Sequence, residues 1–318
     1  MSPNLIIRKL FTAVAEGEYL TLKKLLSVYV NRKYIDARND GDTLLMTAIN
    51  LGHYKMVALL LHHRANPNLK NTYSYRDSAL NIAIRHNYPQ ILALLLKNGA
   101  RVELHDPSEL MRLAINSGYL KPMLLLLRHG VNVNIRNAGG DTALLIAVLH
   151  DNYDAVKLLL RFGANVNDRD MHGKTPLHWA VSRRYESICK LLIEHGASIF
   201  AYDNEGRMPM DNMNSGLVEM ILPYYVASNS TLTKCPLGEA ARHGWSHGVR
   251  LLLDQGHQVD YRMTFGYTPL HEAANLGYTN VVDTLKTKVN EYNLNIVQEA
   301  VDSQWHFRDL VPHIASFL

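Results

Sequence analysis

Apolar and polar positions recur along this chain in blocks of about 33 residues. One block contains two apolar segments, such as TPLHWAV (175–181) and SICKLLI (187–193), which are separated by a short polar turn. In the second segment, Cys189, Leu192 and Ile193 recur at the spacing of one helix face. The pattern therefore predicts a series of helix pairs, each with a tight turn between its two helices.

One position of the first segment sets the register of the blocks, because it nearly always holds a small residue. The aligned residues are Ala13, Ala48, Ala83, Ala114, Ala147, Ala180, Met213, Ala240, Ala273 and Ala300. Successive members lie 35, 35, 31, 33, 33, 33, 27, 33 and 27 residues apart. Copies that stay in phase in this way indicate a repeat architecture, in which each block is one structural repeat.

The ends of the predicted helices are marked by residues with known terminal preferences. Thr175 followed by Pro176 suits a helix with Thr at its N-cap and Pro at its first helical position. Gly196 is expected to end the second helix of the same block. Helices this short are unstable alone, so the repeats must stack and bury their apolar faces against one another.

Several blocks share a TPLH-like start, and most continue with an apolar triplet and a Gly. Examples are GKTPLHWAVSRRYESICKLL (173–192), GYTPLHEAANLGYTNVVDTL (266–285) and LLLRFGA (158–164). These motifs resemble the ankyrin repeat, and the resemblance covers nearly the whole chain. It implies an all-α ankyrin-repeat solenoid of about nine to ten stacked helix-turn-helix units with short hairpin fingers.

The chain contains 16 His, which raises the question of a catalytic or metal site. The TPLH motifs contribute Thr175, His178, Thr268 and His271. In ankyrin repeats this histidine bonds to backbone between adjacent fingers, so the resemblance implies a structural role for His178 and His271. Other repeats hold unrelated residues such as Met46 in the same slot, and no fixed set of partners recurs. We therefore expect no metal site.

The repeat spacing breaks between Met213 and Ala240, where SNSTLTK (228–234) replaces the usual Gly-Ala finger motif. We predict two parts on either side of this break. Residues 1–225 form an N-terminal ankyrin stack with an N-terminal cap. Residues 226–318 form the C-terminal ankyrin units with a degenerate C-terminal cap.

The third repeat has an extended finger, NTYSYRDS (71–78), which contains Tyr73 and Tyr75. Tyrosine is enriched at protein interfaces, which favours contact with a partner. Packing of both rings against neighbouring fingers explains them equally well. The sequence leaves the two interpretations open.

Composition and charge are those of an ordinary soluble protein: 318 residues, 47% hydrophobic, 19% charged, with a net charge of +4. This mild basicity is too small to indicate nucleic-acid binding. The densest apolar run, PMLLLL (122–127), is too short for membrane insertion. Two Cys without zinc-site spacing, and an N-terminus without a signal-peptide core, favour a cytoplasmic location.

None of the motifs GxxxxGK[ST], HExxH and GxSxG occurs in the chain. The candidate nucleophile is Cys235, which has His243 and Asp254 nearby in the sequence. Cys235 also occupies a Thr slot before Pro236, where a helix-cap role explains it. We therefore predict a protein that is not an enzyme and that needs no cofactor.

The resemblance implies protein binding through finger tips and the exposed side of each first helix. The candidate partner-binding residues, including the extended finger, are Tyr73, Tyr75, Arg85, His150, His172, Lys174, Arg183, Arg207, Lys234, Arg242, Phe265 and Tyr267. Many of those in the later repeats are basic or aromatic, which suits an acidic or phosphorylated peptide. The alternative is that they are solvated surface charges.

The resemblance also implies a candidate modification. Some ankyrin repeats are hydroxylated by an asparaginyl hydroxylase at the asparagine at the base of the finger. In this chain Asn68, Asn134 and Asn167 occupy that slot.

We predict a monomeric, non-enzymatic scaffold that binds a protein or peptide. The abundance of Asn, Tyr and Ile, and repeats far from the family consensus, favour a secreted effector of an intracellular bacterium such as Legionella. Such an effector acts in the host cytosol. The alternative is a substrate-recruiting adaptor for a ubiquitin ligase or another enzyme.

Overall fold

The computed structural model describes residues 2–29, 32–72, 77–209, 216–218, 222–223, 226, 235–262 and 266–302. The chain divides into two compact parts, an N-terminal body (Met1–Pro176) and a C-terminal body (Leu177–Leu318). The boundary that the sequence predicts, at residues 226–234, lies almost wholly outside the described residues. It stays a prediction.

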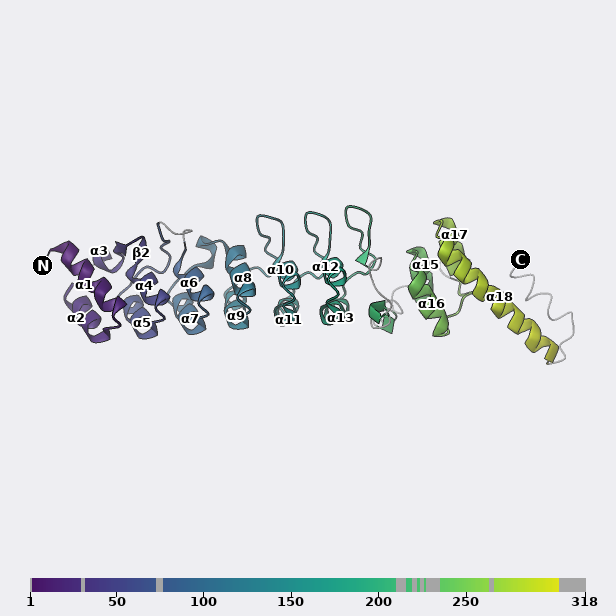
Figure 1. Cartoon of the computed structure of the whole chain (residues 1–318), viewed down its shortest axis with the longest axis horizontal. Coiled ribbons are helices and arrows are strands. Elements are labelled where there is room, and N and C mark those ends of the chain that lie inside the picture. The colour runs from purple at the N-terminus through teal and green to yellow at the C-terminus, as the bar shows by residue number, and fades with distance from the viewer. Residues whose placement is uncertain are drawn as a thin grey trace. The chain divides into compact units, whose positions relative to one another are not determined.

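The N-terminal body consists of paired helices (Figure 1). They are α1 (Pro3–Ala15), α2 (Tyr19–Tyr29), α3 (Arg32–Ile35), α4 (Leu44–Asn50), α5 (Tyr54–His62), α6 (Ala79–Arg85), α7 (Pro89–Lys97), α8 (Pro107–Asn116), α9 (Leu120–Arg128), α10 (Ala143–Leu149) and α11 (Tyr153–Arg161). The first helices α1, α4, α6, α8 and α10 contact one another in order, and so do the second helices α2, α5, α7, α9 and α11. The two rows bury a continuous core between successive repeats, as the helix periodicity predicts.

Side-chain caps explain why the first helices begin where they do. Thr43 Oγ1 accepts from the backbone N–H of Met46, and Thr142 Oγ1 accepts from that of Leu145, both at 3.3 Å. Ser78 makes the equivalent contact at the start of α6 within a capping box. Each cap satisfies an N–H group that the first turn of a helix leaves without a partner. These residues occupy the Thr slot that the sequence alignment identifies.

Residues with positive φ end each first helix and allow the chain to turn into the second helix. Gly52 has φ 70° and Gly118 has φ 72° in this position, whereas the third repeat uses Asn87, with φ 54°. Glycine carries no Cβ atom and adopts this conformation without the steric cost that other residues meet. The tight turn predicted from the polar gap between apolar segments therefore has a clear backbone basis.

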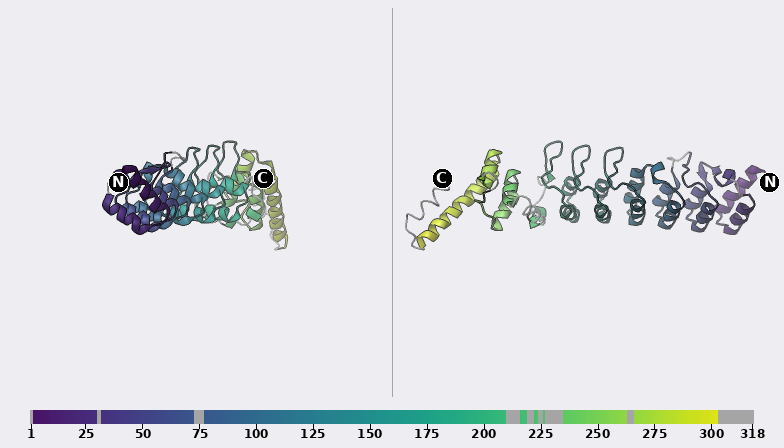
Figure 2. Two further views of the ribbon diagram at one scale, coloured as in Figure 1. Left: turned by 60° about the vertical axis from the view of Figure 1, so that its left-hand side comes forward. Right: turned by 180° about the vertical axis from the view of Figure 1, so that it is seen from behind.

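The fingers are short hairpins between repeats. In the first finger, β1 (Arg38–Asn39) pairs antiparallel with β2 (Asp42–Thr43). In the finger before α12, Asp170 Oδ1 accepts from the backbone N–H groups of His172 and Lys174, both at 2.8 Å. Figure 2 shows this finger and the preceding one projecting from the same side of the N-terminal body. The carboxylate of Asp170 thus holds this loop in shape.

Arginine side chains tie some fingers to their neighbours. Arg38 Nη1 donates to the carbonyl oxygen of Gly41 in its own finger (2.8 Å) and to that of Lys70 in the next (2.7 Å). Arg136 makes the matching pair of bonds, and its bond to the carbonyl of Arg169 in the following finger measures 2.8 Å. We call each such residue an arginine clamp.

The third and fourth repeats are joined without a hairpin. A 3₁₀ turn, Val102–Leu104, occupies this place and is followed by His105 and the N-cap Asp106. This short connection explains why the spacing from Ala83 to Ala114 is 31 residues.

In the C-terminal body the described helices are α12 (Pro176–Ser182), which begins at the last residue of the N-terminal body, α13 (Glu186–Glu194), α15 (Pro236–Arg242), α16 (Ser246–Asp254), α17 (Pro269–Asn275) and α18 (Thr279–Asp302). Helix α15 packs on α17, and α16 packs on α18. The Phe200 ring stacks on the His243 ring, with centroids 4.1 Å apart.

Helix α18 differs from a repeat helix because it runs unbroken for 24 residues. The aligned residue Ala300 therefore lies inside this second helix and does not open a further helix pair. The chain has no Gly or Pro between Gly277 and Pro312, so no local signal ends the helix earlier. Residues 303–318, which belong to the predicted C-terminal cap, lie outside the described residues.

The predicted all-α architecture of paired, stacked helices is confirmed, and the strand pairing in the described part of the chain lies in the fingers. Of the helices that the structure describes, none combines the length and the apolar character needed to cross a bilayer.

Candidate partner-binding surface

The first helices and the fingers are linked by side chains at two fixed slots. Asn50, near the end of α4, donates to Asp42 of the first finger (3.2 Å). One repeat later, Arg85 donates to both carboxylate oxygens of Asp77, at 2.7 and 2.9 Å. The Asp77 carboxylate raises the pKa of Arg85. The predicted contact residue Arg85 is thus held in a fixed position on the surface, with its guanidinium half exposed.

Two arginines of the predicted basic surface, Arg207 and Arg242, are paired with carboxylates of the chain itself. Arg207 bonds to Asp203 (3.1 Å) and Glu205 (2.5 Å). Arg242 bonds to Glu239 in α15 (2.9 Å) and to Glu272 in α17 (3.2 Å). The arginine side chains are 45% and 43% exposed although the carboxylates of Asp203, Glu239 and Glu272 are largely buried, so each guanidinium can bind a further carboxylate or phosphate from a partner.

Arg183, the third arginine predicted to contact a partner in the C-terminal body, differs from Arg207 and Arg242. It forms no ion pair with a carboxylate in the described part of this body. Its guanidinium carbon lies 6.0 Å from the centre of the Trp179 ring, one helical turn earlier in α12. Lys174 and His172 belong to the N-terminal body, and their backbone N–H groups are fixed by Asp170. The basic residues therefore divide between the two bodies.

His150 ends α10 as its C-cap and is exposed. The side-chain amide of Asn116 bonds to two residues. Its nitrogen donates to His150 Nε2 (3.0 Å), and its oxygen accepts from Arg112 Nη1 (3.0 Å). Arg112 also pairs with Glu109. A polar network thus links the ends of the first helices of the fourth and fifth repeats.

The two TPLH histidines lie in different surroundings. His178 is 7% exposed, and its Nε2 lies 3.1 Å from the carbonyl oxygen of Arg207 in the following finger. His271 is exposed, and its Nδ1 lies 2.8 Å from Oγ1 of Thr268 at the start of its own helix. Thr175 is buried directly before α12. His178 therefore joins two repeats, whereas His271 caps its own helix.

Four of the predicted contact residues cannot be placed in this surface. Tyr73, Tyr75, Lys234 and Phe265 lie outside the described residues. Tyr267 is described, with an exposed ring 6.0 Å from the ring of His271.

The asparagines of the predicted hydroxylation slot link consecutive repeats. Asn68 donates to the carbonyl oxygen of Gly99 (2.9 Å) and accepts from the N–H of Arg101 (2.8 Å). Asn134 accepts from the N–H of Asn165 in the same way (2.8 Å). At the third position the backbone N–H of Asn167 donates to Oδ1 of Asn165 (3.1 Å). A modifying enzyme would reach Asn68 or Asn134 only after these bonds open.

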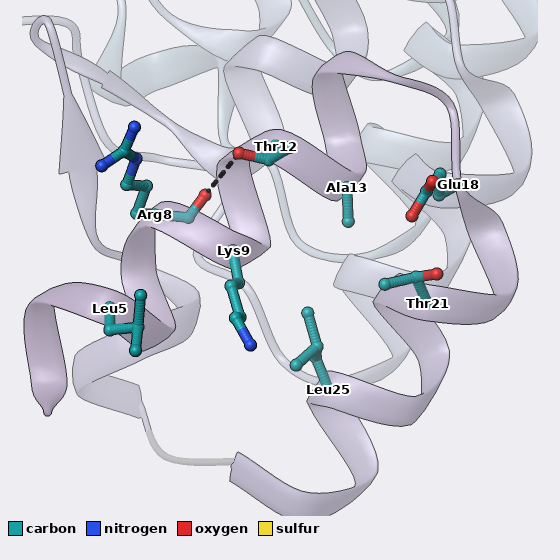
Figure 3. A pocket seen from close by; sticks show the side chains of 8 residues that line it. All are labelled: Leu5, Arg8, Lys9, Thr12, Ala13, Glu18, Thr21 and Leu25. Carbon is teal, nitrogen blue, oxygen red and sulfur yellow. Dashed lines mark hydrogen bonds between the residues drawn. The ribbon is translucent and has the colours of Figure 1, made fainter. Parts of the chain in front are cut away.

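Two hollows lie at the N-terminal end of the N-terminal body. One holds about 640 Å³ between α1, α4 and the first finger, and its lining includes Arg8, Phe11, Arg38 and Asn39. The other holds about 470 Å³ between α1 and α2. Figure 3 shows the Lys9 side chain directed into this second hollow, toward Leu25.

A third hollow, of about 460 Å³, lies between the fourth and fifth repeats and was not predicted from the sequence. Its lining includes Gly118, Asn152 and Tyr153 together with the predicted contact residue His150. A signal for it exists in the sequence, because the slot five residues after the aligned small residue holds an aromatic residue in most repeats but Asn152 here.

Neither cysteine is placed for nucleophilic chemistry. Cys235 is buried and caps α15 by accepting from the N–H of Gly238 (3.2 Å), and burial raises the pKa of its thiol. Burial raises the pKa of Cys189 to about 12. Within the described ranges, no three His, Cys, Asp or Glu side chains gather as a metal site.

Comparison with known proteins agrees with this repeat geometry. A family model described as ankyrin repeats (3 copies) matches three times, over residues 10–106, 110–203 and 210–298. This chain belongs to the ankyrin-repeat family. The resemblance inferred from the TPLH-like motifs is thereby confirmed.

Relatives of this ankyrin-repeat chain come from several kinds of organism. It is 34% identical over 124 residues to a putative ankyrin repeat protein, FPV031, of fowlpox virus, covering 38% of this chain and 36% of the viral protein. It is 30% identical over 145 residues to human ankyrin repeat and SOCS box protein 6, covering 44% and 34%. A match of 29% identity to the Arabidopsis potassium channel AKT2/3 covers 48% of this chain and 19% of the channel. The chain thus spans about a third or less of the length of these relatives.

Solved ankyrin domains have the same fold. The ankyrin repeat domain of Bcl-3 superposes with a TM-score of 0.60 at 24% identity, covering 67% of this chain and 97% of that domain. The ankyrin repeat domain of human ASB11 gives a TM-score of 0.54 at 26% identity, covering 70% and 98%. Ankyrin repeats are protein-interaction modules, so the chain has the fold of a binding module.

Proposed function

We propose that this chain binds a protein or peptide partner through its fingers and the exposed ends of its first helices. The observation that carries the proposal is the hollow of about 640 Å³ between α1, α4 and the first finger. Arg8, Arg38 and Asn39 line it together with the apolar ring of Phe11. A few convergent polar groups beside an apolar surface are typical of a recognition site.

The fixed polar pairs along the same side of the repeats support this proposal. Asn50 with Asp42, and Arg85 with Asp77, keep donors and acceptors in place before a partner arrives. A surface that is already ordered loses less conformational entropy on binding. The row of such pairs therefore favours a partner that follows successive repeats.

The basic side chains indicate the charge of the partner's contact surface. We propose that Lys174, Arg183, Arg207 and Arg242 meet acidic or phosphorylated groups, with Arg183 the most available of them. Arg207 and Arg242 already orient their guanidinium groups through the chain's own carboxylates. Arginine can bind one carboxylate and still offer further N–H donors, because its guanidinium has five.

Capture from lysate followed by mass spectrometry tests the proposal. The test variant combines Arg183→Glu, Arg207→Glu and Arg242→Glu, and we expect it to lose a partner that the intact chain retains. A charge-matched control combines Arg128→Glu, Arg161→Glu and Arg250→Glu, three exposed arginines on second helices. Circular dichroism verifies that both variants fold.

The single variant Arg183→Glu gives an additional check, because Arg183 forms no ion pair with any described residue. Its binding defect is therefore free of effects from broken internal pairs. If all variants retain every partner, the basic residues are not the binding surface. If the intact chain retains no partner at all, the proposed function itself is contradicted.

Adaptor activity is the second candidate function. The observation that favours it is the 30% identity to ankyrin repeat and SOCS box protein 6. An adaptor would recover components of a ubiquitin ligase together with the target. Recovery of a target without ligase components supports the simple binding module instead.

The finer parts of the proposal concern the setting of the protein. We propose a monomeric effector that acts in the cytosol of a host cell, and the fowlpox relative shows that viruses encode ankyrin-repeat proteins of similar sequence. Light scattering tests the monomer. Fractionation of host cells that receive the tagged protein tests its location. Peptide mass spectrometry tests hydroxylation of Asn68, Asn134 and Asn167, since each modified peptide would gain one oxygen atom.

A further inference from the structure

Aromatic rings cover the turn glycines of preceding repeats. The covering slot, five residues after the aligned small residue, holds His53, Tyr88, Tyr119, Asn152, Tyr185, Trp245 and Tyr278. A Cβ atom added to Gly17 would lie 3.7 Å from Cε1 of His53, and one added to Gly52 would lie 2.9 Å from Oη of Tyr88. In the C-terminal body a Cβ atom on Gly244 would lie 2.7 Å from the ring of Tyr278. We call this arrangement the ring-over-glycine contact.

The contact is missing where the covering slot holds Asn152. A Cβ atom added to Gly118 would meet nothing within 4 Å. The Asn152 side chain is short, and it is used to cap α11: its Oδ1 accepts from the N–H of Ala155 at 3.0 Å. The place that a ring occupies over Gly52 is thus open over Gly118, and the hollow of about 460 Å³ lies there. We call this hollow the Gly118 pocket.

The lining of the Gly118 pocket favours a cation. Asp151 and Asp154 both line it, both are exposed, and neither forms an ion pair with any residue that the structure describes. The Tyr153 ring, 38% exposed, also lines it and already attracts the ammonium group of Lys157, whose Nζ lies 5.9 Å from the ring centre. Carboxylates and an aromatic face both attract positive charge.

The shape of the vacancy favours a flat group. The equivalent space over Gly52 is filled by the planar ring of Tyr88. Among cationic side chains, arginine has a planar guanidinium, which stacks on aromatic faces such as that of Tyr153 and pairs with carboxylates through a fixed fork of donors. Lysine has a compact ammonium group and lacks this plane.

We infer that the Gly118 pocket receives an arginine side chain of the partner protein. The guanidinium lies over Gly118, in the place of the missing ring, and pairs with Asp151 and Asp154. This inference rests on the proposed function, because it names one side chain that the partner presents. It concerns the N-terminal body, and the proposed acidic contacts at Arg183, Arg207 and Arg242 belong to the C-terminal body.

Titration of the full chain with capped tripeptides tests the pocket directly. The readout is the backbone amide resonances of Gly118 and Asp154 in ¹H–¹⁵N spectra. We expect saturable shifts with capped Gly-Arg-Gly at millimolar concentration. Capped Gly-citrulline-Gly has nearly the same shape without the charge, and we expect it to bind at least tenfold more weakly. Capped Gly-Tyr-Gly tests whether an aromatic ring fills the space instead.

The variant Asn152→Tyr restores the covering ring and should abolish the shifts. The fold tolerates this residue, because Tyr88 and Tyr119 precede α7 and α9 without any side-chain cap bond. Asp151→Asn and Asp154→Asn should each weaken Gly-Arg-Gly binding several-fold. Asp254→Asn, at an exposed carboxylate in the C-terminal body, is the matched control and should leave binding unchanged.

Three results would overturn the inference: no shift with Gly-Arg-Gly, equal shifts with Gly-Tyr-Gly, or shifts that persist in Asn152→Tyr. None of them would contradict the proposed function, which the capture experiment tests separately. A chain that binds Gly-Arg-Gly and captures no partner would contradict the proposed function and leave the pocket standing.

Discussion

The Tyr88 hydroxyl lies directly over Gly52, and a Cβ atom on that glycine would come within 2.9 Å of Oη and 3.1 Å of Cζ. Gly52 therefore meets two requirements at once. Its φ of 70° is unfavourable for other residues, and its lack of a side chain makes room for the ring of the next repeat. Gly118 meets only the first requirement, because its Cβ direction is open.

This difference predicts unequal effects of the same substitution. Gly118→Ala should lower the free energy of unfolding by about 1–2 kcal/mol, from the positive φ alone. Gly52→Ala should lower it by a further amount of about 1–3 kcal/mol, because the methyl group forces Tyr88 aside. Urea denaturation measures both values. In a Tyr88→Ala background the two substitutions should cost the same, and an unchanged difference would show that the ring is not the cause.

The two TPLH histidines should also differ in their effect on stability. His178→Ala removes a buried donor to the carbonyl oxygen of Arg207 and should destabilise the protein by about 1–3 kcal/mol. His271→Ala removes an exposed side chain that bonds within its own helix start, and about 0.5–1 kcal/mol is expected. Thermal unfolding of the two variants provides the comparison. Equal losses of stability in the two variants would show that the bond from His178 to Arg207 contributes no more than the cap bond of His271.

His105 should make the fold sensitive to mild acid. It is 5% exposed, neither ring nitrogen has a hydrogen-bond partner in the described part of the chain, and burial, aided by the charge of Lys70, lowers its pKa. The unfolded chain then binds the proton more readily than the folded chain does. The stability that neutral His105 contributes is complete above its ordinary pKa of about 6.5. It is lost as the pH falls from there through the lowered pKa.

The variant His105→Leu tests this account. It removes the titrating group and the two unpaired nitrogens, so the free energy of unfolding should rise by about 1–3 kcal/mol. In this variant the free energy of unfolding should fall less steeply between pH 7 and pH 5 than in the unmodified chain. Some decrease should remain, because burial also lowers the pKa of His63, His243 and His257. An unchanged pH profile would show that the pKa of His105 is the same in the folded and the unfolded chain.

The two thiols should be unreactive until the protein unfolds. Cys189 and Cys235 are both buried and their pKa values are raised, so little thiolate is present at neutral pH. A thiol reagent at pH 8 should label neither residue in the native protein and both in guanidinium chloride. Rapid labelling of native Cys235 would contradict its role as a buried helix cap.

The helix pairs were predictable from sequence because their causes are local. Periodic apolar residues, Thr or Ser caps and positive-φ turn residues such as Gly52 act within a few positions of one another. The unbroken α18 was predictable on the same grounds, from the lack of Gly and Pro after Gly277, whereas the alignment sets the block of Ala300 apart as a degenerate C-terminal cap.

The surface was harder to predict because its contacts join residues about 30 positions apart. Arg242 of α15 bonds to Glu272 of α17 in the next repeat, and these two residues meet because the two repeats stack in this register. The same register places the slot of Asn152 over Gly118. Charges read singly along the sequence made Arg207 and Arg242 look unpaired, whereas the fold supplies both with carboxylates.

The arginine clamps affect how the N-terminal body opens. The guanidinium of Arg38 or Arg136 bonds to two fingers, so opening either finger breaks one of its bonds. We therefore expect the amide protons of clamped fingers to exchange more slowly with solvent. The 3₁₀ turn at Val102–Leu104 has no such tie in the described structure. We therefore expect its amide protons to exchange independently of the neighbouring fingers, while α6 stays packed on α8 and α7 on α9 across it.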